Sequence, residues 1–174
     1  MEKFDFVTYM RDCAVRLKDI SHSPSQQRFF RVSGISQLEE LLANLPDAST
    51  PALLVENNTD GRITDPGPAD NFLDIPYFVF YVIEKAPFND FDRIEQAKAE
   101  TKAIGLKILA RMLHDRRHYR NGLIMLRFDN IPYQSIGPIG DNCFGTMFSF
   151  TVHNPMAATY TANDWHPVTV NSEL

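Results

Sequence analysis

A run of seven apolar residues, YFVFYVI at 77–83, constrains the fold of this chain more than any other feature. The run lacks polar alternation, which is typical of a central β-strand that is covered on both faces. It is too short to cross a membrane as a helix, and the chain contains no uninterrupted apolar stretch of about eighteen residues. We therefore expect a layered domain with this strand near the centre of a sheet.

The best-supported helix is expected over 90–118, where apolar residues recur every three or four positions. Asn89 can cap its first turn, because its side chain can accept a hydrogen bond from an otherwise unpaired backbone N–H. Gly105 costs this helix some intrinsic stability, so we expect a close packing approach at that position. Asn121 and Gly122 tolerate the left-handed backbone conformation, which predicts that the helix has ended there.

Two further helices are expected in the N-terminal part of the chain. Residues 4–20 place apolar side chains at three- and four-residue steps, which is the period of one helical face. A shorter helix is expected over 37–44, where Ser36 and Glu39 have the spacing of a capping box. Between these two helices, residues 29–32 are expected to form a short strand.

Three more segments are expected to be strands, because they are rich in apolar, aromatic and β-branched residues. The last of them is the clearest, since Phe148 and Phe150 fall on one face and Ser149 on the other. The stretches 57–74 and 131–141, rich in turn-forming residues such as Gly and Pro, are expected to be irregular connections. The three strands are expected at 52–56, 123–128 and 143–152.

The order of these elements, α-(β-α)-β-β-α-β-β, predicts an α+β domain with an antiparallel or mixed sheet and helices packed on one face. A chain of 174 residues is long enough to bury one substantial core, so we expect a single domain over 1–153. Residues 154–174 are rich in Thr, Ala, Asn and Pro and are expected to form a polar C-terminal tail.

Composition argues against several functional classes. The net charge of -5 makes nucleic acid an unsuitable primary partner, since binding to phosphates needs a basic surface. The N-terminus lacks the basic region and apolar block of a signal peptide, so we expect a cytoplasmic protein with no membrane partner. Cys13 and Cys143 have no nearby partner in the sequence and are expected to be buried as free thiols in a reducing compartment.

The pentapeptide HDRRH places His114 and His118 on one helical face, as a zinc pair requires. The zinc-protease signature, however, has a glutamate after its first histidine, where this chain has the shorter Asp115. Ile124 occupies the position of the third histidine in the extended signature. Because cations also stabilise the C-terminal end of a helix, we expect a basic helix end here, with no metal site, cofactor or catalytic residue.

Charge is distributed unevenly along the chain. Residues 107–120 contain five basic side chains and one acid, whereas 56–74 contain five acids and one base. Opposite charges of this kind can steer two copies into a head-to-tail contact, which makes a ring when the rotation closes. The alternative is that both stretches are solvated faces. The interface candidates are Lys107, Arg111, Arg116, Arg117 and Arg120 on the basic side, and Asp60, Asp65, Asp70 and Asp74 on the acidic side.

The N-terminal amphipathic helix is followed by three notable segments: IPYFVFYVIEKA, FDRIEQAKAETKAIGLKILARML and LIMLRFDNIPYQSIGPIGDNCFGTMFSFTV. In element order and in the aromatic final strand, residues 4–153 resemble the tail-terminator, or tail-completion, proteins of long-tailed bacteriophages and their prophage relatives. The resemblance implies a structural protein without catalytic residues, whose subunits form a ring, commonly a hexamer. Such a ring caps the tail tube, stops its growth and joins the head connector.

The partners implied by this resemblance are further copies of the chain, the tail-tube protein and the head-connector protein. The implied location is the cytoplasm of the host cell and then the virion. The residues leave two other functions open. One is a monomeric or dimeric binding or adaptor domain of another system, and the other is a metal-dependent hydrolase built around His114 and His118.

Overall fold

The central strand of the structure, β4 (Leu73–Lys85), contains the apolar run described above. In this computed structural model it pairs antiparallel with β2 (Ala52–Glu56) on one side and with β6 (Cys143–Thr151) on the other. Phe80 therefore has a strand neighbour on both sides, and the prediction of a central strand is confirmed. The structure describes residues 4–57, 60–65, 67, 72–127, 130–156 and 160–166.

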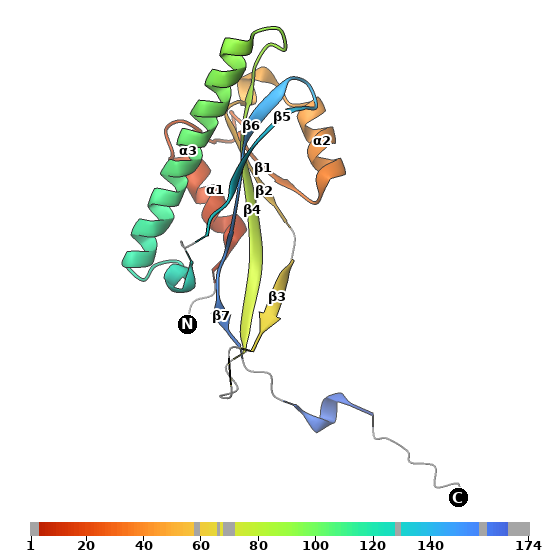
Figure 1. The fold of residues 1–174 in the computed structure, drawn as a ribbon, viewed down its shortest axis with the longest axis vertical. Helices are drawn as coiled ribbons and strands as arrows, with labels where there is room; N and C mark the ends of the chain where they lie inside the picture. The colour runs from red at the N-terminus through yellow and green to blue at the C-terminus, as the bar shows by residue number, and fades with distance from the viewer. Residues whose placement is uncertain are drawn as a thin grey trace, which may run out of the picture.

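The main sheet has the strand order β1-β2-β4-β6-β5, and it is mixed because β1 (Phe29–Val32) runs parallel to β2. β5 (Tyr133–Ile139) forms the opposite edge. At one end β4 pairs with two further strands, β3 (Gly61–Thr64) and β7 (Asn154–Pro155). We call β3, β7 and the part of β4 that pairs with them the arm; it occupies the lower end of the view in Figure 1.

The helices lie on both faces of the sheet (Figure 1). α1 (Phe6–Arg16) and α3 (Phe91–Arg117) share one face, and α2 (Ile35–Ala43) lies on the other. The α+β class and the mixed sheet are confirmed, but the expectation that all helices cover one face is wrong. Three short 3-10 turns complete the described elements: η1 (Asp47–Ser49), η2 (Leu123–Met125) and η3 (Ala162–Asp164).

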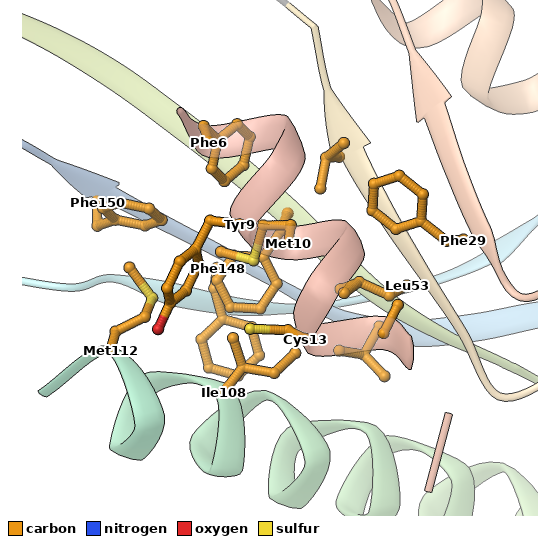
Figure 2. Close-up of a cluster of buried hydrophobic side chains, with 14 of the residues drawn as sticks. Phe6, Tyr9, Met10, Cys13, Phe29, Leu53, Ile108, Met112, Phe148 and Phe150 are labelled. Atoms are coloured by element: carbon orange, nitrogen blue, oxygen red, sulfur yellow. The ribbon is translucent and has the colours of Figure 1, made fainter. Parts of the chain in front are cut away.

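Alternation along the strands explains why two helical layers are needed. Phe80 and Val82 point into a core with α1 and α3, whereas Val79 and Tyr81 point into a second core with α2. Figure 2 shows the larger core, in which side chains of α1 and α3 meet over Phe148. A strand that is apolar on both faces leaves unfavourable apolar surface in water unless both faces are covered.

The predicted helix interiors are correct, and the predicted ends need correction. Asp5 caps α1, which ends at Arg16 because Leu17 has an extended backbone conformation. Asp90, and not Asn89, caps α3 by accepting a hydrogen bond from the Arg93 backbone N–H at 3.0 Å. A single residue decides each helix end, so a periodicity of three or four residues cannot locate it.

The capping box predicted for α2 is wrong. The helix begins at Ile35, directly after Gly34, whose φ of 81° is in the left-handed region that favours glycine. Ser36 is therefore already inside the helix, and no side chain caps the first turn. Gln37 instead accepts a hydrogen bond from the Ser33 backbone N–H at 2.5 Å, which ties the helix to the preceding chain.

Two predicted loops contain strands, and one predicted strand is absent. Residues 57–74 include β3 and the start of β4, and residues 131–141 include β5. Residues 123–125 form η2, and nearby Leu126 makes only an isolated bridge to Val152. The edge position beside β6 is taken by β5, where a bulge between Ile136 and Ile139 accommodates Gly137 and Pro138.

Two smaller predictions concern the cysteines and the tail. Cys13 and Cys143 are buried free thiols, as expected, and burial raises the pKa of each to about 11. Asn154 and Pro155, expected to open the tail, instead form β7. None of the helices in the described part of the chain combines the length and the apolarity needed to cross a membrane.

Candidate functional site

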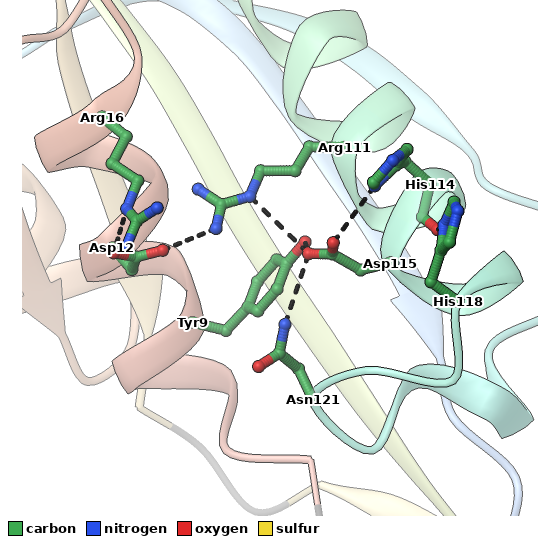
Figure 3. A network of polar contacts seen from close by, with 8 residues as sticks. All are labelled: Tyr9, Asp12, Arg16, Arg111, His114, Asp115, His118 and Asn121. Atoms are coloured by element: carbon green, nitrogen blue, oxygen red, sulfur yellow. Dashed lines mark hydrogen bonds and ion pairs between the residues drawn. The ribbon is translucent and has the colours of Figure 1, made fainter.

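The end of α3 carries the HDRRH pentapeptide, and its one acid, Asp115, makes several polar contacts there (Figure 3). Asp115 is buried and accepts a hydrogen bond from the Tyr9 hydroxyl of α1 at 2.8 Å. The Asn121 side-chain amide donates a second bond at 3.3 Å. Arg111 Nε lies 3.6 Å away and His114 Nδ1 lies 3.4 Å away. Both carboxylate oxygens are thus occupied by groups of the same chain.

These partners also determine the charge of the site. Burial by itself would raise the pKa of Asp115, but the Tyr9 hydrogen bond and the neighbouring His114 and Arg111 hold it below its usual value. Burial, with the adjacent carboxylate, raises the pKa of Tyr9, so its hydroxyl remains a donor. Asp115 is consequently an ionised structural anchor between α1 and α3.

His114 and His118 do share a helical face, with ring centroids 4.2 Å apart. His118 Nδ1, however, donates to the His114 backbone carbonyl at 2.7 Å. Within the residues that the structure describes, no group of three or more His, Cys, Asp or Glu side chains is placed to hold a metal ion. Among the residues described, the arrangement therefore offers a histidine pair without the third protein ligand of a catalytic zinc site.

Two of the predicted basic interface residues contact acids of their own chain. Lys107 Nζ lies 2.8 Å from the carboxylate of Asp19, and Arg111 Nη2 lies 2.6 Å from that of Asp12. Both ion pairs join α3 to α1 or to the turn that follows it. The basic surface is therefore smaller than the sequence indicates. We call exposed Arg117 and Arg120 the basic helix end; Arg116, between His114 and Arg117 in the sequence, is half-buried.

The acidic candidates gather at the arm. Asp60 directly precedes β3, and its carbonyl accepts a hydrogen bond from the Tyr77 backbone N–H at 2.8 Å. Asp65 follows β3 and is exposed, whereas Asp74 lies within β4, where it pairs with Asn154. We call Asp60 and Asp65, which lie at the two ends of β3, the acidic side of the arm; Asp74 lies on the other face of β4 from Ile75. The fourth candidate, Asp70, lies outside the described residues.

A groove of about 600 Å³ lies where the arm joins the main sheet. Ile75 and Tyr77 of β4 line it together with Ser149 of β6, and the Tyr77 hydroxyl donates to Ser149 Oγ at 2.8 Å. These side chains belong to the sheet face on which α2 lies, since alternate residues of each strand share a face. The rim is polar and includes Asp60, Arg62, Arg127 and His153.

Sequence reasoning missed both the Tyr9–Asp115 contact and the groove. Strand alternation had assigned Ser149 to the face opposite Phe148, and this was the one signal that bore on the groove. The other lining residues come from separate strands and connections, so no local spacing relates them. Tyr9 and Asp115 are separated by 106 positions, which leaves no periodic signal either.

No protein family model matches this chain, and no curated protein matches its sequence. The basic helix end and strand β3, with Asp60 and Asp65 at its ends, lie on opposite sides of β4 in Figure 1, and a groove lies at the base of the arm.

Proposed function

We propose that this protein is a non-enzymatic assembly subunit that associates with further copies of itself into a ring. The observation that carries the proposal is that the C-terminal end of α3 and strand β3 lie on opposite sides of β4 in the view of Figure 1, which separates the basic helix end from Asp60 and Asp65 at the two ends of β3. A contact that joins the basic helix end of one copy to the arm of the next brings opposite charges together. Such head-to-tail contacts form a ring when the rotation closes.

The arm supports this proposal because it presents an exposed edge. Gly61, Arg62 and Ile63 of β3 are all exposed, and the Ile63 side chain retains 64% of its accessible surface. The edge of a strand carries backbone groups that can pair with another chain. An exposed apolar residue on such an edge favours a contact surface. The basic helix end supplies the opposite charge, and electrostatic complementarity then fixes the order of the subunits.

The role in assembly follows the resemblance to tail terminators. In that role the ring caps a phage or prophage tail tube, stops its polymerisation and joins the head connector. The subunit would be made in the cytoplasm of the host cell and would end in the virion. The catalytic alternative has less support, because the carboxylate of Asp115 is held by Tyr9 and Asn121.

The experiment is a pair of charge reversals, measured by native mass spectrometry and sedimentation velocity. One variant combines Arg117→Glu with Arg120→Glu, and the other combines Asp60→Lys with Asp65→Lys. Each variant alone should remain monomeric, because both of its surfaces then carry the same sign. An equimolar mixture should assemble again with alternating subunits, because every contact regains opposite charges.

Lys18→Glu provides the matched control, since this exposed residue lies just beyond α1 and away from both surfaces. It should assemble as the wild-type chain does. A wild-type protein that stays monomeric or dimeric at every concentration and ionic strength would contradict the proposal and favour the adaptor domain. Assembly of the two variants separately, with no gain on mixing, would show that these charges do not form the contact.

A further inference from the structure

The described C-terminal segment, residues 160–166 with the sequence YTANDWH, carries an aromatic pair that is open to solvent. Tyr160 and Trp165 retain 72% and 65% of their accessible surface, and their rings stack with centroids 6.2 Å apart. η3 holds them together through backbone bonds such as that from Asp164 N–H to the Thr161 carbonyl at 3.0 Å. We call these residues the aromatic segment. Figure 1 shows it away from the body of the molecule.

Exposed tryptophan and tyrosine are characteristic of residues that dominate the binding free energy at interfaces. Both rings combine a large apolar area with a polar group, and their stacking already restricts their rotamers. A preorganised pair of this kind loses less conformational entropy on binding than two independent side chains do. The aromatic segment thus has the composition and order of a docking segment. It needs an apolar, partly polar cavity as its receptor.

The groove at the base of the arm has matching properties. Its volume of about 600 Å³ lies in the range of cavities that enclose a large ligand group. Its floor contains Ile75 and Tyr77, and Tyr77 remains partly exposed beside Ser149. Aromatic rings can pack on such a floor while their polar atoms reach the hydroxyl groups.

Charge is complementary as well. Asp164 lies within the aromatic segment, next to Trp165, and the groove rim includes the guanidinium groups of Arg62 and Arg127. A carboxylate beside a guanidinium forms a charge-assisted hydrogen bond. An arginine can also lie over an indole or phenol ring. The aromatic segment therefore presents a carboxylate and aromatic rings, and an arginine of the rim can bind either group.

Geometry favours the groove of a second copy over the segment's own groove. β7 runs antiparallel to β4 and away from the groove, and the Met156 backbone N–H then bonds the Phe72 carbonyl at 3.0 Å. The residues that line the groove include none of 160–166, and Tyr160 and Trp165 are both exposed, so the aromatic segment does not fill its own groove in this structure.

We propose that the aromatic segment of one copy occupies the groove of the next copy, with Trp165 against the floor and Asp164 at Arg62. This inference rests on the self-association proposed above and names a contact within it. Donation of a segment from one copy to the next is directional, so it fits a head-to-tail ring. It also gives the polar C-terminal part of the chain a function.

Trp165 is the only tryptophan in the chain, so its fluorescence reports on this contact alone. As the full-length protein is concentrated, the emission should move to shorter wavelength and acrylamide quenching should fall, in step with the rise in mass. Assembly with an unchanged, exposed tryptophan would overturn the inference and leave the proposed function standing. A shifted emission in the monomer would show that the segment binds its own chain and would also overturn it. Failure to assemble at all overturns both.

Charge exchange tests the contact at single residues. Arg62→Glu and Asp164→Lys should each raise the concentration at the midpoint of the fluorescence shift roughly tenfold, because like charges then meet. The double variant should recover the wild-type midpoint, and Lys18→Glu should not change it. Recovery of the wild-type midpoint in the double variant would indicate a direct contact, because a second charge change would not repair a folding defect. Two single effects that simply add in the double variant would overturn the pairing of Asp164 with Arg62.

Discussion

The carboxylate of Asp115 anchors the C-terminal end of α3 to α1. It is buried between charged and polar neighbours, and a buried carboxylate is tolerated only when several donors satisfy it. The decisive donor, Tyr9, comes from α1. The resulting hydrogen bond fixes the end of one helix against the middle of another. His114 and His118 both remain exposed to solvent.

Replacement of Tyr9 by phenylalanine tests this anchor. Tyr9→Phe removes one donor from a buried carboxylate and should lower the free energy of unfolding by about 1–3 kcal/mol at pH 7. Asp115 has a lowered pKa when folded, so the stability it provides is present above its unfolded value of 3.8. That stability is lost as the pH falls from there through the folded value. The difference between wild type and variant should therefore shrink below pH 3.8.

Urea unfolding followed by circular dichroism at several pH values measures both effects. Tyr119→Phe is the matched control, because Tyr119 is 77% exposed and its hydroxyl can be solvated by water. It should leave the free energy of unfolding unchanged. An effect of Tyr9→Phe that is constant from neutral pH to pH 3 would contradict the assignment of a bond to an ionised carboxylate.

At the scale of elements, the close contact between α3 and β6 depends on Gly105, which has no side chain. A Cβ atom at Gly105 would lie 2.1 Å from Cε2 of Phe148, far inside van der Waals contact. Phe148 cannot yield, because it is fully buried and stacks on Phe80 with a centroid distance of 5.0 Å. The glycine that weakens the isolated helix thus permits the close approach that the sheet requires.

Gly105→Ala should therefore destabilise the protein by about 1–3 kcal/mol, although alanine is the better helix former. The matched control is Ala99→Gly at an exposed position of the same helix, which should cost about 1 kcal/mol through helix propensity alone. Thermal and urea unfolding measure both variants. An alanine at position 105 that stabilises the protein would show that propensity outweighs packing at this site.

At the scale of the whole molecule, the two cores share one sheet. Val82 lies in the core with α1 and α3, and its neighbour Ile83 lies in the core with α2. Loss of either helical layer exposes one face of the same strands. The two layers are therefore expected to unfold together, as small single domains usually do.

This coupling predicts one transition, with coincident curves from far-ultraviolet circular dichroism and tyrosine absorbance. Leu42→Ala on the α2 side and Met112→Ala on the α3 side each remove a fully buried side chain. Each should cost about 2–5 kcal/mol and shift the single transition without splitting it. Two separated transitions in either variant would show that one layer unfolds independently.

Local patterns in the sequence were sufficient for the central elements. The apolar run at 77–83 identified β4, periodicity identified α3, and the alternation through Phe148 identified the two faces of β6. Each of these signals depends on residues a few positions apart, which the geometry of a helix or a strand places together directly. The apolar run at 77–83 also predicted that both faces of β4 are covered, whereas the order of the elements predicted helices on one face of the sheet.

Only the tertiary structure decided which residues meet across the chain. It paired Lys107 and Arg111 with acids near α1, placed β5 beside β6 where η2 had been expected as a strand, and assembled the groove from separate segments. The charge of a side chain indicates which kind of group it can bind. The group that it actually meets depends on how distant elements pack together. The sequence by itself therefore determined the central elements and the charges of this protein, and folding determined the arrangement of the helical layers and which charges remain on the surface.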